Sequence, residues 1–548
     1  MIVFIKKFMQ EKLFTKIENK KGSTLAFVLV AVIIVAITMT SLLTYISSQL
    51  SYSKDRVERE RAFEIAESGA YYYRWYLAHQ VSGKTAEQIK NFWESGSPEG
   101  VGTPLEVEYV DPELGAIGKY KLEVTKPALG STIVVVKSTG WTYLKPSVKK
   151  VVQVRFRRPS WSENSVLAND NMRFGDGTTV TGKMHSNKGI RFDGVATNII
   201  SSSLATYDDP DHSGGNEFGV HTHANVAPAT GVNDAYRAAE ALPNAVPART
   251  DVFQAGRTFP APQLDFNSVV SDISFMRSQA TVKFDNSGKG MHIKLKTDGT
   301  MDTCRVNTFD PTSNDILTYT GIVKNGSAAN NNKPCTTITA ACCTAATCAW
   351  IKPSDHNKGQ CISSTSYTIP NNGIVFVANN LWLEGTIDNK KVSFVADELS
   401  DEPQGGGVAN TGGNKNVFLG MNNLLYANSN GLSNGTDIIG IIAQKDVEII
   451  QNSQSNLTID AALLAKEGRV GRQPYGSNKS TITINGSIAT NIRYGFAYVG
   501  NTYNCGSGVT VGDGYCFRNI NFDNNLLYFP PPYFPTGTEY AIDQWDEL

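Results

Sequence analysis

KKGSTLAFVLVAVIIVAI, residues 20–37, is a basic pair followed by a glycine, two small polar residues and a long apolar run. No charged side chain occurs between Lys21 and Lys54, which leaves more than the roughly 20 residues that a helix needs to cross a bilayer. The sequence therefore predicts a transmembrane helix. Its anchoring side chains are Leu25, Phe27, Val28, Ile33, Ile34 and Ile37.

The charges before this run predict its orientation. Residues 1–21 contain six lysines and two glutamates. Because positively charged flanks stay on the cytoplasmic side of a membrane, we expect a cytoplasmic N-terminus. The chain is then a single-pass membrane protein whose large C-terminal part is extracytoplasmic or lies on the cell surface.

The apolar run continues into a charged segment that favours a helix, residues 54–79. In it, Phe63, Ala66, Ala70, Tyr73 and Leu77 recur at helical spacing. A secretory signal has the same basic and apolar layout, but it ends in a small-residue cleavage site that this run lacks. We expect one long helix, half of it an anchor and half of it amphipathic.

Two stretches resemble a known family. KKGSTLAFVLV is similar to a prepilin cleavage region, and ERAFEIAESGAYYYRWYL resembles the helix that follows the anchor in PilX-type minor pilins of bacterial type IV pili. The resemblance implies that a prepilin peptidase cuts after Gly22. The mature chain would then begin at Ser23 and contact membrane lipid and other pilin-like subunits.

The mature N-terminus departs from that family at two positions. Major pilins usually carry phenylalanine first and glutamate fifth, where this chain has Ser23 and Phe27. In the family that glutamate is thought to pair with a neighbouring subunit's terminal amine inside the filament, a buried ion pair whose loss needs compensation. The departure fits a minor, tip or initiating subunit. A plain membrane-tethered protein remains an alternative.

Three runs of alternating apolar residues follow a Gly/Pro/Ser break at residues 95–103. They are GKYKLEVTK at 118–126, STIVVVKSTGW at 131–141 and KKVVQVRFRRP at 149–159. Alternation with period two predicts strands, and we expect them to form a small antiparallel subdomain over residues 99–160. The basic run at 155–158 is expected on an exposed strand face or a membrane-proximal patch.

Beyond residue 160, short units recur in which an apolar pair precedes a small residue, polar turn residues and a second β-prone stretch. Aligning Ala443, Ala465 and Ala489 gives steps of 22 and 24 residues, which is a typical coil length for a solenoid. We expect a mainly β fold in which the helix and the small antiparallel sheet are followed by a parallel β-helix-like solenoid, with a β-sandwich as the alternative. The proline-rich and aromatic tail is expected to lie along this body and shield its last coil.

All eight cysteines lie beyond residue 300, and an even number in an exported chain favours disulfides. Cys505 and Cys516 flank a glycine-rich stretch and are expected to close a loop. A metal site and free thiols are the alternatives. The other six belong to a cysteine-rich insert at residues 303–366: Cys304, Cys335, Cys342, Cys343, Cys348 and Cys361.

Composition and motifs point away from catalysis. The 50 basic and 51 acidic residues balance, which gives no reason to expect a nucleic-acid partner. No nucleophile elbow, phosphate-binding loop or dinucleotide fingerprint occurs, so no catalytic residue and no cofactor is assigned.

Two polar clusters contain residue types that bind metal ions. His221 and His223 are spaced to share a metal, with His212 upstream among Asp208, Asp209 and Asp211, but their Gly/Pro-rich context favours a solvated surface. The acidic group at 397, 398, 401 and 402 is expected to be an exposed turn. No metal ligand is assigned.

The predicted organisation is a leader at 1–22, a transmembrane and amphipathic helix at 23–98, a small β subdomain at 99–160 and a solenoid-like domain at 161–548. The predicted function is that of a membrane-anchored minor pilin-like subunit in filament assembly, priming or adhesion, with a surface or polysaccharide ligand as a further partner. The alternative is a membrane-tethered β-helix protein that binds or cleaves polysaccharide.

Overall fold

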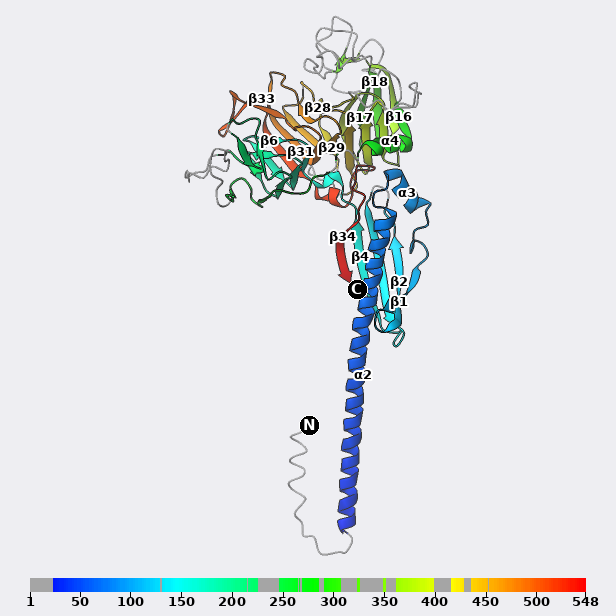
Figure 1. Ribbon diagram of the computed structural model, residues 1–548. Coiled ribbons are helices and arrows are strands. Elements are labelled where there is room, and N and C mark those ends of the chain that lie inside the picture. The colour runs from blue at the N-terminus through cyan, green and yellow to red at the C-terminus, as the bar shows by residue number, and fades with distance from the viewer. Residues whose placement is uncertain are drawn as a thin grey trace.

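The computed structural model describes residues 23–128, 131–213, 215–224, 246–264, 266, 269–284, 290–306, 323–325, 348–350, 361–398, 415–427, 435–451 and 453–548. The described chain is mainly β, with one long N-terminal helix, an antiparallel sheet and a large sheet of mostly parallel strands. In Figure 1 the helix extends from the molecule as a stalk, the antiparallel sheet packs on its upper half and the larger sheet forms the body above.

Helix α2 (Ser23–Gln80) confirms the expectation of one continuous helix. Its first half has no contact that buries it: Leu25 is 75% exposed and Ile33 is 47% exposed. In the second half the side chains predicted to face inward do so, with Phe63 half-buried and the others buried. The fully buried apolar positions on this face are Ala62, Ile65, Ala66, Ala70, Tyr73 and Leu77.

The antiparallel sheet has the strand order β1-β2-β3-β4-β34. The three predicted runs form β2 (Gly115–Thr125), β3 (Ile133–Thr142) and β4 (Lys149–Arg157), and their inward residues contact α2. One outer strand, β1 (Leu105–Asp111), is local in sequence. The other, β34 (Ala541–Glu547), comes from the end of the chain.

The body is therefore inserted between two neighbouring strands of the first sheet. β34 pairs antiparallel with β4, and everything between them lies outside this sheet. The points of departure and return are adjacent, because Ser160 forms a β-bridge with Thr536. This corrects the predicted boundary: the last strand belongs to the small β subdomain, not to the 161–548 domain.

Most strands of the body stack in parallel, one coil above the next. The longest line of stacked strands is, in spatial order, β16 (Val282–Phe284), β22 (Ile374–Val377), β24 (Lys391–Ala396), β27 (Ile438–Ala443), β29 (Asn456–Ala465), β31 (Asn478–Thr490), β5 (Val166–Ala168), β8 (Met184–Ser186), β11 (Ile200–Ser202) and β15 (Arg257–Thr258). A parallel β-helix-like solenoid requires parallel pairing on this scale, whereas the alternative, a β-sandwich, does not.

Shorter lines of strands complete the coils. One contains β17 (Met291–Leu295), β23 (Leu381–Ile387), β25 (Val417–Leu419), β28 (Val447–Ile449) and β30 (Val470–Arg472), and a related line contains β6 (Met172–Phe174), β9 (Ile190–Phe192) and β14 (Val220–His221). Another line contains β33 (Val509–Phe522), β7 (Thr178–Thr181) and β10 (Val195–Ala196), and β26 (Leu424–Tyr426) pairs with β23 and β29. Aliphatic and aromatic side chains from these lines fill one continuous core.

Antiparallel additions decorate the coils. They are β12 (Thr206–Asp208) with β13 (Asn216–Phe218), β18 (Thr300–Val306) with β17 and β21 (Cys361–Thr368), β19 (Val323–Asn325) with β20 (Cys348–Trp350), and β32 (Ala497–Gly506) with β33.

The chain enters this stack in its middle. β5 follows the first sheet, and the next coils build outward from it to β15. The chain then resumes at the opposite end with β16 and works back until β31 pairs with β5. The first and last coils of the body are thus neighbours.

The outer face of the longest strand line is covered by helix α4 (Val269–Gln279) and by the tail, which includes η4 (Asn524–Leu527). Pro532 O accepts a hydrogen bond from Ser393 Oγ at 2.5 Å, and Phe534 is buried. The tail was expected to shield the last coil. It instead crosses the middle coils before joining the first sheet, at the junction where α3 (Ala86–Glu94) contacts α4.

Candidate functional site

The contact between α2 and the first sheet joins the exposed anchor to the folded part. Glu58 is almost fully buried and accepts a hydrogen bond from Thr142 Oγ1 at 2.5 Å, while Arg61 donates to its other oxygen at 3.2 Å. A buried carboxylate needs such partners because desolvation disfavours its charge. These bonds fix α2 to the C-terminal end of β3, at the level where the exposed, apolar half of the helix ends.

Glycines allow helix and sheet to approach closely. A Cβ on Gly140 would lie 2.3 Å from the carbonyl oxygen of Ala62 and 2.5 Å from the nitrogen of Ala66. On the helix side, a Cβ on Gly69 would lie 2.3 Å from Ser138 Oγ. The backbones of α2 and β3 are therefore packed as near as glycine permits.

The structure places the predicted processing and anchor residues at the far end of α2. Ser23 is its first residue, and Gly22 lies outside the described residues, so cleavage between them stays a prediction. The segment is the one helix in the described chain that is long and apolar enough to cross a membrane. The six predicted anchor side chains are all exposed along it: Leu25, Phe27, Val28, Ile33, Ile34 and Ile37.

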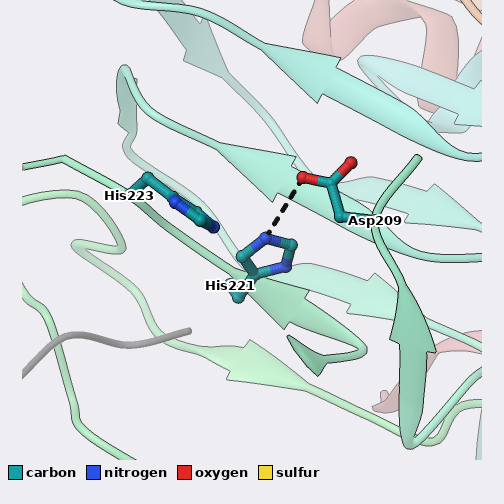
Figure 2. A group of neighbouring side chains, drawn as sticks. All are labelled: Asp209, His221 and His223. Atoms are coloured by element: carbon teal, nitrogen blue, oxygen red, sulfur yellow. Dashed lines mark ion pairs between the residues drawn. The ribbon is translucent and has the colours of Figure 1, made fainter. Parts of the chain in front are cut away.

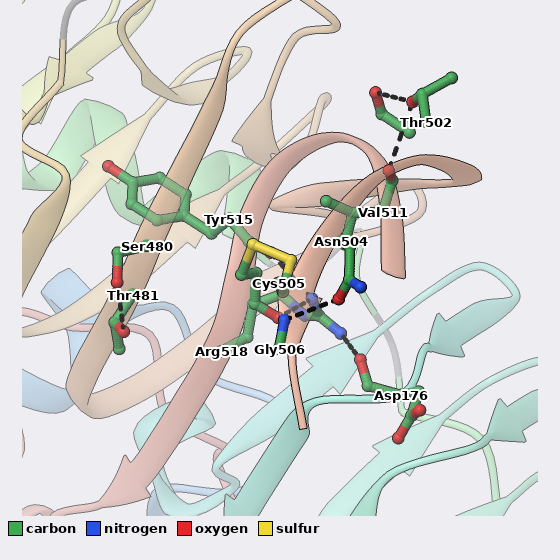
Figure 3. The surroundings of a disulfide bond; sticks show 12 residues. Asp176, Ser480, Thr481, Thr502, Asn504, Cys505, Gly506, Val511, Tyr515 and Arg518 are labelled. Carbon is green, nitrogen blue, oxygen red and sulfur yellow. Dashed lines mark hydrogen bonds between the residues drawn. A yellow bond between two sulfur atoms is a disulfide. The ribbon is translucent and has the colours of Figure 1, made fainter. Parts of the chain in front are cut away.

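Cys505 and Cys516 form a disulfide, with their Cα atoms 5.6 Å apart. Figure 3 shows that it links β32 to β33, beside Arg518, whose guanidinium donates to the Cys516 carbonyl at 2.6 Å. Cys304, Cys348 and Cys361 lie on β18, β20 and β21, but the structure does not describe their side chains. The remaining three predicted disulfide cysteines, Cys335, Cys342 and Cys343, lie outside the described residues.

The histidine pair predicted to be solvated is in fact packed against the β12–β13 hairpin. His221 is the last residue of β14 and is fully buried, and His223 follows it. Asp209, just after β12, is also buried, and its Oδ2 lies 3.6 Å from His221 Nε2 (Figure 2). One donor atom from each of these three residues lies within 4.8 Å of the other two. The solvated-surface expectation was wrong because parallel pairing of β14 with β9 draws this segment into a coil.

A second group shares His223. His212 and Glu217 flank the tip of the hairpin, with His212 Nδ1 2.7 Å from Glu217 Oε1. The rings of His212 and His223 meet edge to face, their centroids 4.3 Å apart. Of the acidic residues noted with the histidines, Asp208 is exposed, and Asp211 pairs with Arg173 at 3.4 Å and with Arg493.

Burial controls the protonation of this cluster. It lowers the pKa of His223 to about 4, and the neighbouring Arg191, His221 and His212 act in the same direction. Burial alone would raise the pKa of Asp209, but His221, the Asp211 backbone N–H and Arg191 outweigh it and hold that pKa below its usual value. At neutral pH the cluster therefore presents an ionised carboxylate beside a neutral imidazole.

The predicted acidic turn is less exposed than expected. Asp397 is buried and Glu398 is half-buried, with Lys415 Nζ 3.3 Å from Glu398 Oε1 and Lys466 Nζ 4.0 Å from Asp397 Oδ2. The neighbouring coils supply these lysines, which sequence spacing alone does not indicate. Asp401 and Glu402 lie outside the described residues.

A groove of about 1100 Å³ runs between the β32–β33 hairpin and the coils that carry the histidines. His223 lies on its wall, together with Arg173, Arg493 and Tyr498. The groove thus connects the buried cluster to solvent.

No protein-family model matches this chain, and no curated protein matches it. Among solved structures, the crystal structure of the competence-associated pilin ComZ from Thermus thermophilus is similar over 90% of this chain and 97% of that chain, with 15% sequence identity and a TM-score of 0.28.

Sequence reasoning identified the histidines but not the part played by Glu217. Glu217 is fully buried, and its Oε2 accepts a hydrogen bond from the Asp209 backbone N–H at 3.0 Å. Its position eight residues after Asp209 places the two on facing arms of a hairpin. A predicted hairpin over residues 206–218 would have been the sequence signal that placed Glu217 beside Asp209.

Proposed function

We propose that this chain is a membrane-anchored, minor pilin-like subunit of a type IV pilus or a related system, and that it displays its β-rich body outside the cell for filament assembly, priming or adhesion. The observation that carries the proposal is the division of α2 into an apolar, contact-free half and a half buried on an antiparallel sheet.

An apolar helical surface of this length needs a covering that the described chain does not provide. Lipid and the apolar helices of neighbouring subunits are the two environments that satisfy it without cost. Because the other half of the same helix is fixed to the sheet by Glu58 and by the close approach at Gly140, movement of the anchor is transmitted to the whole folded part. This is the arrangement that a helix-packed filament subunit requires.

The inserted body is the natural candidate for the displayed module. It leaves and re-enters the first sheet at one point, so it adds mass at the end of the molecule opposite the anchor without interrupting the contact between α2 and the sheet (Figure 1).

The test is the N-terminus of the mature protein, measured by mass spectrometry in membrane and sheared-filament fractions. A start at Ser23 in the sheared fraction supports the proposal, and an intact Met1 confined to the membrane contradicts it. Gly22→Leu should leave a longer, unprocessed chain in the membrane, whereas Ser51→Leu, within α2 and away from the predicted cleavage site, should mature normally.

The alternative role in binding or cleaving polysaccharide would use the groove beside the histidines. Cleavage by two carboxyl groups requires a free acid and base pair. Of the four carboxylates that line the groove, Asp170, Asp193 and Asp211 form ion pairs within the described chain, Asp193 with Arg191 at 2.8 Å, and Asp176 is the fourth. These pairings favour recognition over catalysis, and we propose no enzymatic activity for the body.

A further inference from the structure

The β12–β13 hairpin depends on contacts outside its own hydrogen bonds. Within the described residues its two strands pair only with each other, over three residue pairs. A two-stranded hairpin of this size is marginal in water on its own. What holds it against the stack must therefore come from its side chains. Two of them meet His221: the ring of Tyr207, whose centroid is 5.5 Å from that of the imidazole, and the carboxylate of Asp209.

The buried imidazoles have nitrogens that no hydrogen bond accounts for. Neither ring nitrogen of His221 has a hydrogen-bond partner in the described chain, and the same is true of His223 Nε2. Nε2 of His221 faces Asp209 at 3.6 Å, too far for a normal hydrogen bond. A buried polar atom left in this state costs about 1–3 kcal/mol, so three of them in one cluster call for a ligand.

The donor set has the composition of a transition-metal site. Two imidazoles and one carboxylate are a recurring set for zinc and for other divalent first-row metals. The ligand atoms lie within 4.8 Å of one another, whereas bonds of about 2.1 Å in a tetrahedron place ligands about 3.4 Å apart. Closing that difference takes small rotations of side chains that are already turned toward one point (Figure 2).

The surrounding charge also suits a cation. Around the cluster, ion pairs and hydrogen bonds join more carboxylates than guanidinium groups: Asp193, Asp209, Asp211 and Glu217 against Arg173, Arg191 and Arg493. These carboxylates outnumber the guanidinium groups by one, and a bound dication would offset that excess negative charge.

We propose that Asp209, His221 and His223 bind a divalent first-row transition metal ion, for which zinc is the closest match, and that the ion fastens the β12–β13 hairpin to the coil carrying β14. Asp209 comes from the hairpin, and the two histidines come from the coil. The wall of the groove, where His223 lies, gives the ion access from solvent and leaves a fourth position for water.

His212 and Glu217 are positioning residues in this arrangement. Glu217 accepts from the Asp209 backbone and lies beside the His212 ring, which in turn packs on His223. Their pairing at 2.7 Å satisfies both without a metal.

The experiment uses the full-length, detergent-solubilised protein under non-reducing conditions, stripped with a chelator and then titrated with zinc chloride or cobalt chloride. We expect a tight site whose cobalt complex absorbs in the visible range as a tetrahedral or five-coordinate ion does. His223→Gln and Asp209→Asn should weaken that site more than about tenfold. Zinc should also protect the backbone of residues 206–221 from hydrogen exchange in the wild type but not in these variants.

Two variants serve as controls. His185→Gln removes another buried histidine of the stack, one whose nitrogens contact Ser201 at 2.9 Å and Asn187 at 3.2 Å, and it should leave the site intact. His212→Ala should weaken binding less than His223→Gln does. Wild-type protein that shows no visible cobalt spectrum, or a site that survives both Asp209→Asn and His223→Gln, would overturn the proposal. So would a site lost in His212→Ala but retained in Asp209→Asn.

Discussion

Arg155 and Asp543 are 388 positions apart in the chain, yet Arg155 Nε donates a hydrogen bond to Asp543 Oδ2 at 2.5 Å. Arg157 Nε also reaches this carboxylate, at 3.4 Å. The basic run of β4 is therefore not the free patch expected from the sequence. Its arginines form side-chain bonds between β4 and β34, the two neighbouring strands of the first sheet between which the body is inserted.

Asp543→Ala should lower the free energy of unfolding by about 1–2 kcal/mol, because it leaves the half-buried guanidinium of Arg155 without this acceptor and removes one of the two carboxylates that pair with Arg157, the other being Glu163. Urea unfolding monitored by tryptophan fluorescence measures this. In a double-mutant cycle with Arg155→Ala, additive effects would show that the pair contributes nothing as a pair.

Excising the body should leave the first sheet folded. Gly537 N donates to Pro159 O at 2.7 Å, so a short glycine linker can join residue 159 to residue 537. The resulting chain should keep α2 on a five-stranded sheet, as measured by circular dichroism and hydrogen exchange in detergent. A matched chain that also lacks residues 541–548 should lose protection in β4, since it removes the neighbouring strand. Equal protection in both chains would contradict the role given to β34.

Gly140→Ala should separate helix from sheet. The new methyl group would meet the α2 backbone at Ala62 and Ala66, which cannot move aside as a flexible side chain can. We expect a loss of about 3 kcal/mol in stability. Gly495→Ala is the control, because nothing lies within 4 Å of its added methyl group. Similar stability changes in the two variants would refute the close-packing argument.

Glu448 should make the body less stable as the pH rises. Burial raises its pKa from 4.5 to about 8, so the folded protein holds a proton that the unfolded chain releases. Its contribution is complete below pH 4.5, declines as the pH rises toward 8 and amounts to roughly 3–5 kcal/mol. Measured unfolding free energies of the wild type should fall across this window relative to those of Glu448→Gln. Parallel curves would show that Glu448 is not protonated in the fold.

Breaking the Cys505–Cys516 bond should loosen the β32–β33 hairpin. The bond closes a loop with a sequence separation of 11, for which the chain-entropy model gives roughly 3 kcal/mol. The double variant Cys505→Ser, Cys516→Ser should be cut by protease within residues 497–512 under conditions where the wild type resists. Unchanged resistance would mean that strand pairing alone holds the hairpin.

The sequence predicted well those elements whose partners are close in the chain. β2, β3 and β4 appear where alternation indicated them, and the helical face from Phe63 to Leu77 packs as its spacing predicted. The partner of β34 could not be predicted from the sequence, because β4 lies far away in the chain. The alternation of residues within β34 indicates a strand but does not identify which strand pairs with it.

The coil repeat shows more clearly which features sequence spacing cannot predict. Ala443 and Ala465 are register partners, as the 22-residue step predicted, but Ala465 pairs with Thr490 and not with Ala489. A slip of one residue turns a side chain to the opposite face of a strand. Ala465 accordingly packs in the inner core, and Ala489 packs on the outer face under the tail. Spacing alone cannot detect such a slip.

The first strand of the body, β5, lies in the middle of the stack, and this position matters for the proposed export. In the proposed topology, strands β5, β8 and β11 would cross the membrane before β31. Until β31 follows, β5 has no neighbour on one side, because Ile488 of β31 is the residue that pairs with Val166. An unpaired strand edge invites pairing with other chains. If the body is exported as proposed, this edge closes only after β31 has crossed, and a chain stalled before that point would present an unpaired strand edge to its neighbours.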